Sequence, residues 1–201
     1  MTNTQTETGK KSQRLIRAVK DSRPGHYTDL CIELIKGGAD VNIQDNSGTS
    51  ALSYSALNGH TDIALALIDH GADVNAHDKL SLTPLMYAAS SNMDNTVLAL
   101  ISRGAKVNAA TNDGQTALMY AAWSGFPEAA FVLVDHGADP AQKNNNGQTA
   151  QDQAHRSNNS DLAVRIHQHH VAYIKKTFEK AAQSGTTKAR KICRRKIKAA
   201  P

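Results

Sequence analysis

The sequence predicts an all-α protein, an elongated solenoid of short helix pairs that stack on one another and are joined by turn or hairpin loops. Two short motifs recur with the same step of 33 residues, a period typical of helical repeat proteins. Aromatic residues make up only 4% of the 201 residues, fewer than one large central core would use. Alanines are therefore expected to fill much of the core.

The first motif is a glycine-containing turn. It reads Gly-Ala-Asp-Val-Asn at 38–42 and 71–75 and returns with changes at 104–108 and 137–141. The second motif begins at Ser50, Thr83, Thr116 and Thr149, and a tyrosine follows it in the first three units at Tyr54, Tyr87 and Tyr120. Both motifs keep the same phase, so they mark one structural unit.

Local chemistry predicts a helix pair within each unit. In the third unit, the Thr116 hydroxyl can cap a first helix. Gly125 interrupts this helix, and Pro127 suits the first position of a second helix over 128–136. Gly137 ends that helix in the left-handed conformation that glycine tolerates.

These motifs resemble the ankyrin-repeat family, whose unit of the same length carries Thr-Pro-Leu-His-x-Ala and ends in a Gly-Ala-Asp-Val-Asn-like turn. The resemblance implies an ankyrin-type solenoid. We expect a disordered N-terminus over 1–11, an N-terminal capping repeat over 12–44, full repeats over 45–77, 78–110 and 111–143, a C-terminal capping repeat with a helix extension over 144–184, and a basic tail over 185–201.

Both ends of the solenoid are expected to differ from the internal units. At the front, the loop over 21–27 is longer than the other loops between helices. At the back, Gln151, Gln153 and His155 replace leucine, tyrosine and alanine, as expected for a helix that faces water. Apolar residues then recur at helical spacing from Leu162 onward, which predicts a last helix that extends toward residue 182.

Several classes of protein are disfavoured. The sequence has no long apolar run and no apolar N-terminal segment, so we expect a cytoplasmic chain without a membrane span or secretory signal. Two distant cysteines, Cys31 and Cys193, give neither a disulfide scaffold nor zinc-ligand spacing. Cys31 is expected to be a small core residue.

The sequence predicts no enzyme, cofactor or metal. It contains no glycine-rich phosphate loop, zinc-protease motif or nucleophile elbow. Among nine histidines, His60, His70 and His136 follow the repeat. The cluster over 167–170 is expected to form a solvated helix face, because further metal ligands at suitable spacing are not evident.

The charge is divided unequally along the chain. Residues 171–201 contain ten basic residues and one acid, a net charge of +9, whereas residues 1–170 contain 13 basic and 17 acidic residues, a net charge of −4. The end of this basic region could contact an anionic membrane, nucleic acid or an acidic partner, serve as the address of an exported bacterial effector, or be disordered. Its candidate contact residues are Arg190, Lys191, Arg194, Arg195, Lys196 and Lys198.

The resemblance implies a monomer that binds a partner protein through the loop tips and inner helix ends, which form a concave face. Carried onto this chain, the main candidates are Leu57, Asn58, Lys79, Leu80, Leu82, Asp113, Gln115, Trp123, Asn145 and Arg156. Trp123, Leu80 and Leu82 are apolar at positions that the repeat leaves exposed, and such clusters often mark contact sites. The alternative is that Trp123 packs as ordinary repeat surface.

The solenoid interpretation predicts that one unit alone cannot fold. A peptide over 45–78 should remain unfolded by circular dichroism, because its helices lose the neighbours that bury their apolar faces. Cooperative melting of this peptide would contradict the interpretation.

Overall fold

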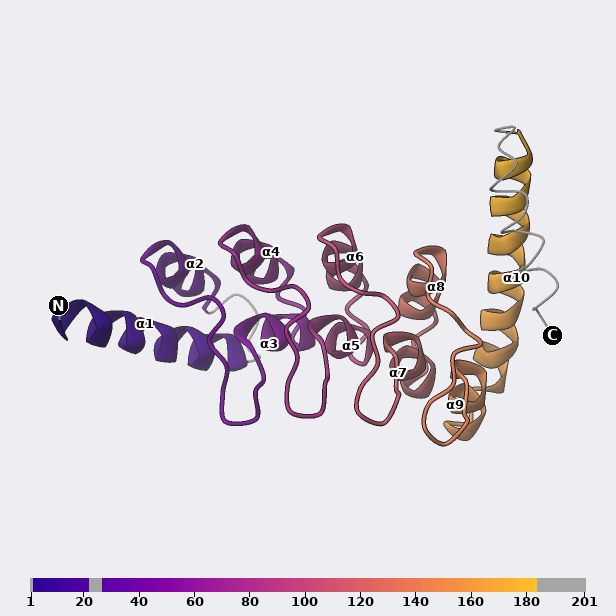
Figure 1. Ribbon diagram of the computed structural model, residues 1–201, viewed down its shortest axis with the longest axis horizontal. Coiled ribbons are helices and arrows are strands. Elements are labelled where there is room, and N and C mark those ends of the chain that lie inside the picture. Colours follow the sequence, from indigo (N-terminus) through magenta and orange to yellow (C-terminus); the bar gives the residue numbers. More distant parts are fainter. Residues whose placement is uncertain (1, 22–26, 184–201) are drawn as a thin grey trace.

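The computed structural model describes residues 2–21 and 27–183, which contain ten helices and no β-strand (Figure 1). Isolated antiparallel bridges, Gln44 with Ser50 and Ala110 with Thr116, occur in two of the hairpin loops. The helices are α1 (Thr2–Lys20), α2 (Thr28–Lys36), α3 (Ala51–Leu57), α4 (Thr61–Asp69), α5 (Pro84–Ala89), α6 (Asp94–Ser102), α7 (Ala117–Ser124), α8 (Pro127–Asp135), α9 (Ala150–Arg156) and α10 (Ser160–Gln183).

The helices form five pairs arranged in two rows. Helices α1, α3, α5, α7 and α9 make the inner row, and α2, α4, α6, α8 and α10 make the outer row, each helix contacting its pair mate and the next helix of its row. The hairpin loops project from the inner row, away from the outer helices (Figure 1). We call the surface formed by the hairpins and the inner helices the inner face. This architecture confirms the predicted all-α solenoid.

The start of each inner helix after α1 is set by the same side-chain chemistry. Ser50 accepts a hydrogen bond from the backbone N–H three residues later, and Thr83, Thr116 and Thr149 do the same in the following units. Such a cap satisfies a donor that a helix start leaves unpaired. The motif that set the period in the sequence therefore fixes where the helices begin.

Alanine supplies much of the core, as the composition predicted. Leu52, Leu85 and Leu118 recur at one register position and are each 1% exposed. Between them lie alanines on the inner row that are fully buried, among them Ala56, Ala88, Ala89, Ala121 and Ala122. A side chain that ends at Cβ lets neighbouring helices approach closely, so the rows pack tightly with few aromatic residues.

A ladder of asparagines joins consecutive units. Asn42 donates a hydrogen bond through Nδ2 to the carbonyl of Gly71 and accepts one at Oδ1 from the N–H of Asp73, at 3.2 and 2.9 Å. Asn75 and Asn108 make the same two bonds to the following units. Alanine stands at the corresponding position in the last turn, at residue 141.

The N-terminus differs from expectation. Residues 2–11 belong to α1 instead of forming a disordered segment. Lys11 Nζ donates to the carbonyl of Gly37 at 2.9 Å, and the buried hydroxyl of Ser12 accepts from the N–H of Asp40 at 2.8 Å. These bonds fix the middle of α1 against the turn after α2, and extending a formed helix costs little compared with nucleating one.

The C-terminal end also needs one correction. Helix α10 has 24 residues, so the expected extension is present, and its buried residues Leu162 and Ile166 cover the end of the stack. Gln153, expected to face water, is only 5% exposed. Its amide donates to Gln148 Oε1 at 3.1 Å, and this bond allows a polar side chain to be buried there.

Lys20, at the end of α1, joins the N-terminal helix pair of α1 and α2 to the first hairpin. Its Nζ donates to Asp45 Oδ2 at 2.8 Å and lies 4.6 Å from the centre of the Tyr54 ring. Burial opposes ionisation of Asp45, yet hydrogen bonds from Lys20, from Tyr54 and from two backbone N–H groups hold its pKa well below the usual range.

The Asp45 carboxylate should stabilise the fold in a pH-dependent way. Because its folded pKa is depressed, the stabilisation is present above the unfolded value of about 3.9 and is lost as the pH falls through the folded pKa. Asp45→Asn, which retains an acceptor oxygen for the turn, should reduce the free energy of unfolding by about 1 to 3 kcal/mol at neutral pH.

Urea denaturation of both proteins tests this expectation. The difference between wild type and Asp45→Asn should shrink as the pH falls from about 7 to about 3. An equal difference at both pH values would show that the charge of Asp45 contributes nothing.

Candidate functional site

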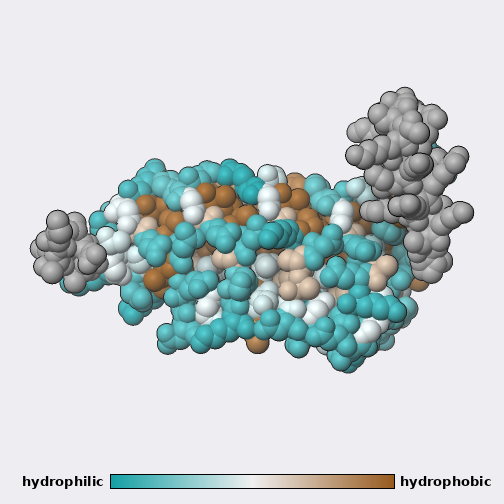
Figure 2. Space-filling view, viewed as in Figure 1, coloured by the Kyte–Doolittle hydropathy of each residue, from teal (hydrophilic) through white to brown (hydrophobic). Residues whose placement is uncertain are grey.

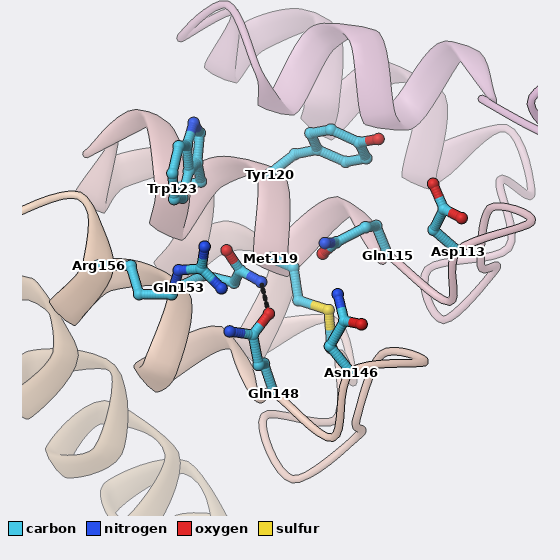
Figure 3. Close-up of a pocket in the computed structure, with 9 residues that line it drawn as sticks. All are labelled: Asp113, Gln115, Met119, Tyr120, Trp123, Asn146, Gln148, Gln153 and Arg156. Atoms are coloured by element: carbon cyan, nitrogen blue, oxygen red, sulfur yellow. Dashed lines mark hydrogen bonds between the residues drawn. The ribbon is translucent and has the colours of Figure 1, made fainter.

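A pocket of about 320 Å³ opens on the inner face between the third and fourth hairpin units. Figure 3 shows its walls, which come from two hairpins and from α7 and α9. The lining residues are Asp113, Gln115, Met119, Tyr120, Trp123, Asn146, Gln148, Gln153 and Arg156. The pocket is therefore built at one junction between units.

A tyrosine–aspartate pair occupies the equivalent place in the first two units. Tyr54 Oη donates to Asp45 Oδ2 at 2.8 Å, and Tyr87 Oη donates to Asp78 Oδ2 at the same distance. Burial, together with Asp78, raises the pKa of Tyr87 to about 12. In each unit the other oxygen of the aspartate accepts backbone N–H bonds that close the hairpin.

The pair is lost in the third unit. Thr111 stands where the carboxylate would be, and its hydroxyl accepts the hairpin bond from the N–H of Gln115 at 3.0 Å. The hairpin still closes, but Tyr120 has no hydrogen-bond partner among the described residues. Burial, followed by the carboxylates of Asp113 and Asp78, raises the pKa of Tyr120, so its hydroxyl remains a neutral donor.

The fourth unit departs further from the pattern. Asn144 closes its hairpin by accepting the N–H groups of Asn146 and Gln148, at 3.0 and 2.9 Å. Gln153 stands at the tyrosine position and bonds Gln148 instead of Asn144 Oδ1 (Figure 3). Both walls of the pocket thus come from units in which the repeated pair is absent.

Opposite charges lie at the two ends of the pocket. The guanidinium of Arg156 lies 6.0 Å from the centre of the Trp123 ring, which is 48% exposed. Figure 3 shows Asp113 at the other end, with the hydroxyl of Tyr120 directed toward its side. Neither Arg156 nor Asp113 forms an ion pair with a described residue. Both charges are thus available to a ligand.

Four of the ten residues that the resemblance implied lie together in this pocket: Asp113, Gln115, Trp123 and Arg156. Six lie outside its lining: Leu57, Asn58, Lys79, Leu80, Leu82 and Asn145. Two of these six make structural hydrogen bonds between units through their side chains. Asn58 donates to the carbonyl of Val19 and Asn145 to that of Asn112, each at 2.9 Å.

The two hairpin leucines differ from each other. Leu80 is 62% exposed, whereas Leu82 is half-buried and packs against the core, contrary to the expectation that the hairpin leaves it uncovered. Neither leucine lines the pocket with Trp123. On the face seen in Figure 2, the hairpin edge is mostly hydrophilic and hydrophobic residues show mainly over the helices.

Five lining residues are not among those ten. Asn146 and Gln148 belong to the loop tips that the resemblance implied, whereas three residues were missed by reasoning from the sequence: Met119, Tyr120 and Gln153. All three occupy positions that are ordinary core or repeat positions in the other units. Comparison of the units shows that Thr111 replaces the aspartate of the first two units. That this replacement deprives Tyr120 of a partner follows only from the tyrosine–aspartate hydrogen bonds seen in the structure.

Other candidates lie elsewhere. The six basic residues proposed for the tail fall outside the described residues. His169, expected on a solvated face, stacks on Phe131 with ring centres 4.6 Å apart and contacts Asp135 Oδ1 through Nε2 at 2.9 Å. Cys31 is fully buried, and burial raises the pKa of its thiol to about 11. Within residues 2–21 and 27–183, the helices are too short or too polar to cross a membrane.

Comparison with known families agrees with this geometry. A family model described as ankyrin repeats in three copies matches residues 15–111 and 95–144. The chain belongs to the ankyrin-repeat family. Comparison with curated proteins gave no match.

Ankyrin repeats generally serve as protein–protein interaction modules, and enzymatic activity is not typical of them. The match ends at residue 144, so α9 and α10 lie beyond it. The pocket spans this limit, because α7 belongs to a matched ankyrin repeat and Arg156 to the unmatched terminal unit.

The two tyrosines should respond differently to loss of the hydroxyl. Tyr87→Phe should reduce the free energy of unfolding by about 1 to 3 kcal/mol, because it removes a hydrogen bond from a carboxylate. Tyr120→Phe should change it by less than about 0.5 kcal/mol. Chemical denaturation measures both, and an equal loss would mean that Tyr120 has a structural partner after all.

Proposed function

We propose that this protein is a non-catalytic interaction module, an adaptor, inhibitor or scaffold, that binds a partner protein through the inner face, centred on the pocket at Trp123. One observation carries the proposal: the indole of Trp123 is half-exposed in a pocket walled by two units. Tryptophan is enriched among the residues that contribute most to binding at protein interfaces.

The surroundings of Trp123 support binding. An exposed aromatic side chain bordered by polar side chains is a common arrangement at an interface, because the polar side chains help to exclude water from the contact. Here the polar side chains include Gln115, Asn146, Gln148 and Arg156. The rest of the hairpin edge is largely hydrophilic, which favours one local contact over a broad apolar interface (Figure 2).

The chemistry of the lining favours binding over catalysis. The nine residues include no serine, cysteine, lysine or histidine, so the carboxylate of Asp113 and the hydroxyl of Tyr120 have no further nucleophile or imidazole beside them in the lining. What the lining offers is two opposite charges, amides and an indole. These groups recognise a ligand by contact.

The charge of the basic tail suggests a second function, which is binding to an anionic membrane or to nucleic acid through that tail. Binding through many cations should collapse between low and moderate salt, whereas binding at an indole-centred pocket should be much less sensitive. The salt dependence of partner binding therefore separates the two surfaces. A location in the cytoplasm and a monomeric state remain part of the proposal.

Substitution of the indole tests the proposal. Once a partner has been purified, Trp123→Ala should raise its Kd by about thirtyfold, which corresponds to about 2 kcal/mol, while the melting temperature of the repeats changes little. Isothermal titration calorimetry measures the affinity and circular dichroism the melting temperature.

The matched control is Leu98→Ala. Leu98 is 46% exposed, close to the value for Trp123, but lies on the outer helix α6. Its replacement should leave the affinity unchanged. If Trp123→Ala leaves the affinity of the folded protein intact, or if Leu98→Ala weakens binding equally, the pocket is not the binding site.

A further inference from the structure

The charges at the two ends of the pocket are exceptions to the repeat. At the hairpin-tip position the four units have Ser47, Leu80, Asp113 and Asn146, so only one carries a charge. At the end of the inner helix they have Leu57, Ser90, Trp123 and Arg156, and again only one is charged. Each single charge lies at the same pocket, and the two have opposite signs.

Three other lysine or arginine side chains among the described residues form ion pairs, whereas others, such as Lys79 and Lys106, form none with a described residue. Lys20 pairs with Asp45, Arg103 with Asp69, and Arg165 with Asp161. Arg156 instead lies over the indole of Trp123, where its positive charge is held near an exposed apolar surface. An acidic side chain placed on that surface would meet both a cation and an indole.

The opposite end of the pocket suits a cation. The carboxylate of Asp113 is exposed, and the hydroxyl of Tyr120 on its side is half-buried without the aspartate partner that Tyr54 and Tyr87 have. A lysine or arginine side chain could pair with the carboxylate and donate to the tyrosine oxygen. The replacement of aspartate by Thr111 is what leaves this oxygen available.

Amide side chains occupy the space between the two ends. Gln148 is held by its bond from Gln153, whereas Gln115 and Asn146 make no side-chain hydrogen bond with a described residue. An amide can donate and accept at once, which matches the alternating groups of an extended peptide backbone.

We propose that the pocket binds an extended peptide segment of the partner that carries one basic and one acidic side chain at a fixed spacing. The basic side chain lies at Asp113 and Tyr120, and the acidic one at Arg156 over Trp123. This inference rests on the proposed function, since it names the chemistry recognised by the same pocket. Opposite charges at both ends also fix the direction in which the segment lies.

A displayed library of random peptides tests the inference without a known partner. Selection on the full chain should enrich peptides with a basic and an acidic residue at constant spacing. Selection on Arg156→Glu should give peptides with a basic residue in place of the acidic one and an unchanged basic residue at the other position. Selection on Asp113→Lys should give peptides with an acidic residue in place of the basic one and an unchanged acidic residue. The charge-reversal controls, Glu33→Lys on α2 and Lys106→Glu in a turn, should select the same peptides as the wild type.

Affinities of an enriched peptide complete the test. Each charge reversal in the pocket should lower the affinity for the peptide selected on the wild type by about tenfold, and each control substitution should leave this affinity unchanged. Thr111→Asp offers Tyr120 a carboxylate like those of the first two units. This substitution should lower the affinity for the peptide severalfold while the melting temperature of the protein is retained. Peptides without the charge pair, or reversals that select the same peptides as the wild type, would overturn the inference.

Trp123→Ala distinguishes the two proposals. If the enriched peptides need Trp123 but lack the charge pair, the inference fails and the proposed function stands. If they bind Trp123→Ala as well as the wild type, the pocket is not the binding site and both proposals fail.

Discussion

No internal helix of this protein can be stable by itself. The helices between α1 and α10 have six to nine residues, below the length at which an isolated helix forms in water. Each becomes stable only when its apolar side meets its pair mate and the next helix of its row, so contacts between neighbouring units hold the whole fold together. Because every internal unit must pack against its neighbours in the same way, the same residues recur at the same positions.

This regularity gives each exception a meaning. The caps at Ser50, Thr83, Thr116 and Thr149 and the asparagine ladder are kept because each satisfies backbone polar groups at a helix start or a turn. The tyrosine–aspartate pair also satisfies polar groups of the hairpin in the first two units, and it is absent from the third unit. Losing such a bond reduces stability unless the hairpin closes in another way, as it does through Thr111.

The sequence was sufficient for the parts of the fold that depend on neighbouring residues. Helix starts, breaks and the number of pairs follow from hydroxyl caps, from Gly125 and Pro127 and from the period itself, and the structure agrees with them. The extension of α1 could not be predicted, because it depends on contacts of Lys11 and Ser12 with residues 37–40. Contacts of this kind join distant parts of the chain and leave no local pattern.

The candidate site was predictable only in part, for the same reason. Comparison of units identifies Asp113, Trp123 and Arg156 as unusual for their positions, but sequence position gives no direction to a side chain. It suggested that Leu82 is exposed, whereas this side chain packs against the core, and that Gln153 faces water, whereas it is buried against Gln148. Only the arrangement in space showed that the exceptions of two units share one pocket.

The position of the pocket follows from the way the stack ends. Helix α7 has an inner helix on both sides, whereas α9 is the last of its row and packs instead against α10. The residues of α9 that line the pocket, Gln153 and Arg156, lie on the side that it shares with α7 and depart from the residues of the earlier units. The junction of α7 and α9 therefore combines a wall that keeps the repeated tyrosine with a wall that departs from the repeat. Packing of both helices within the stack gives the rigidity that favours affinity, and the side chains that depart from the repeat supply specificity.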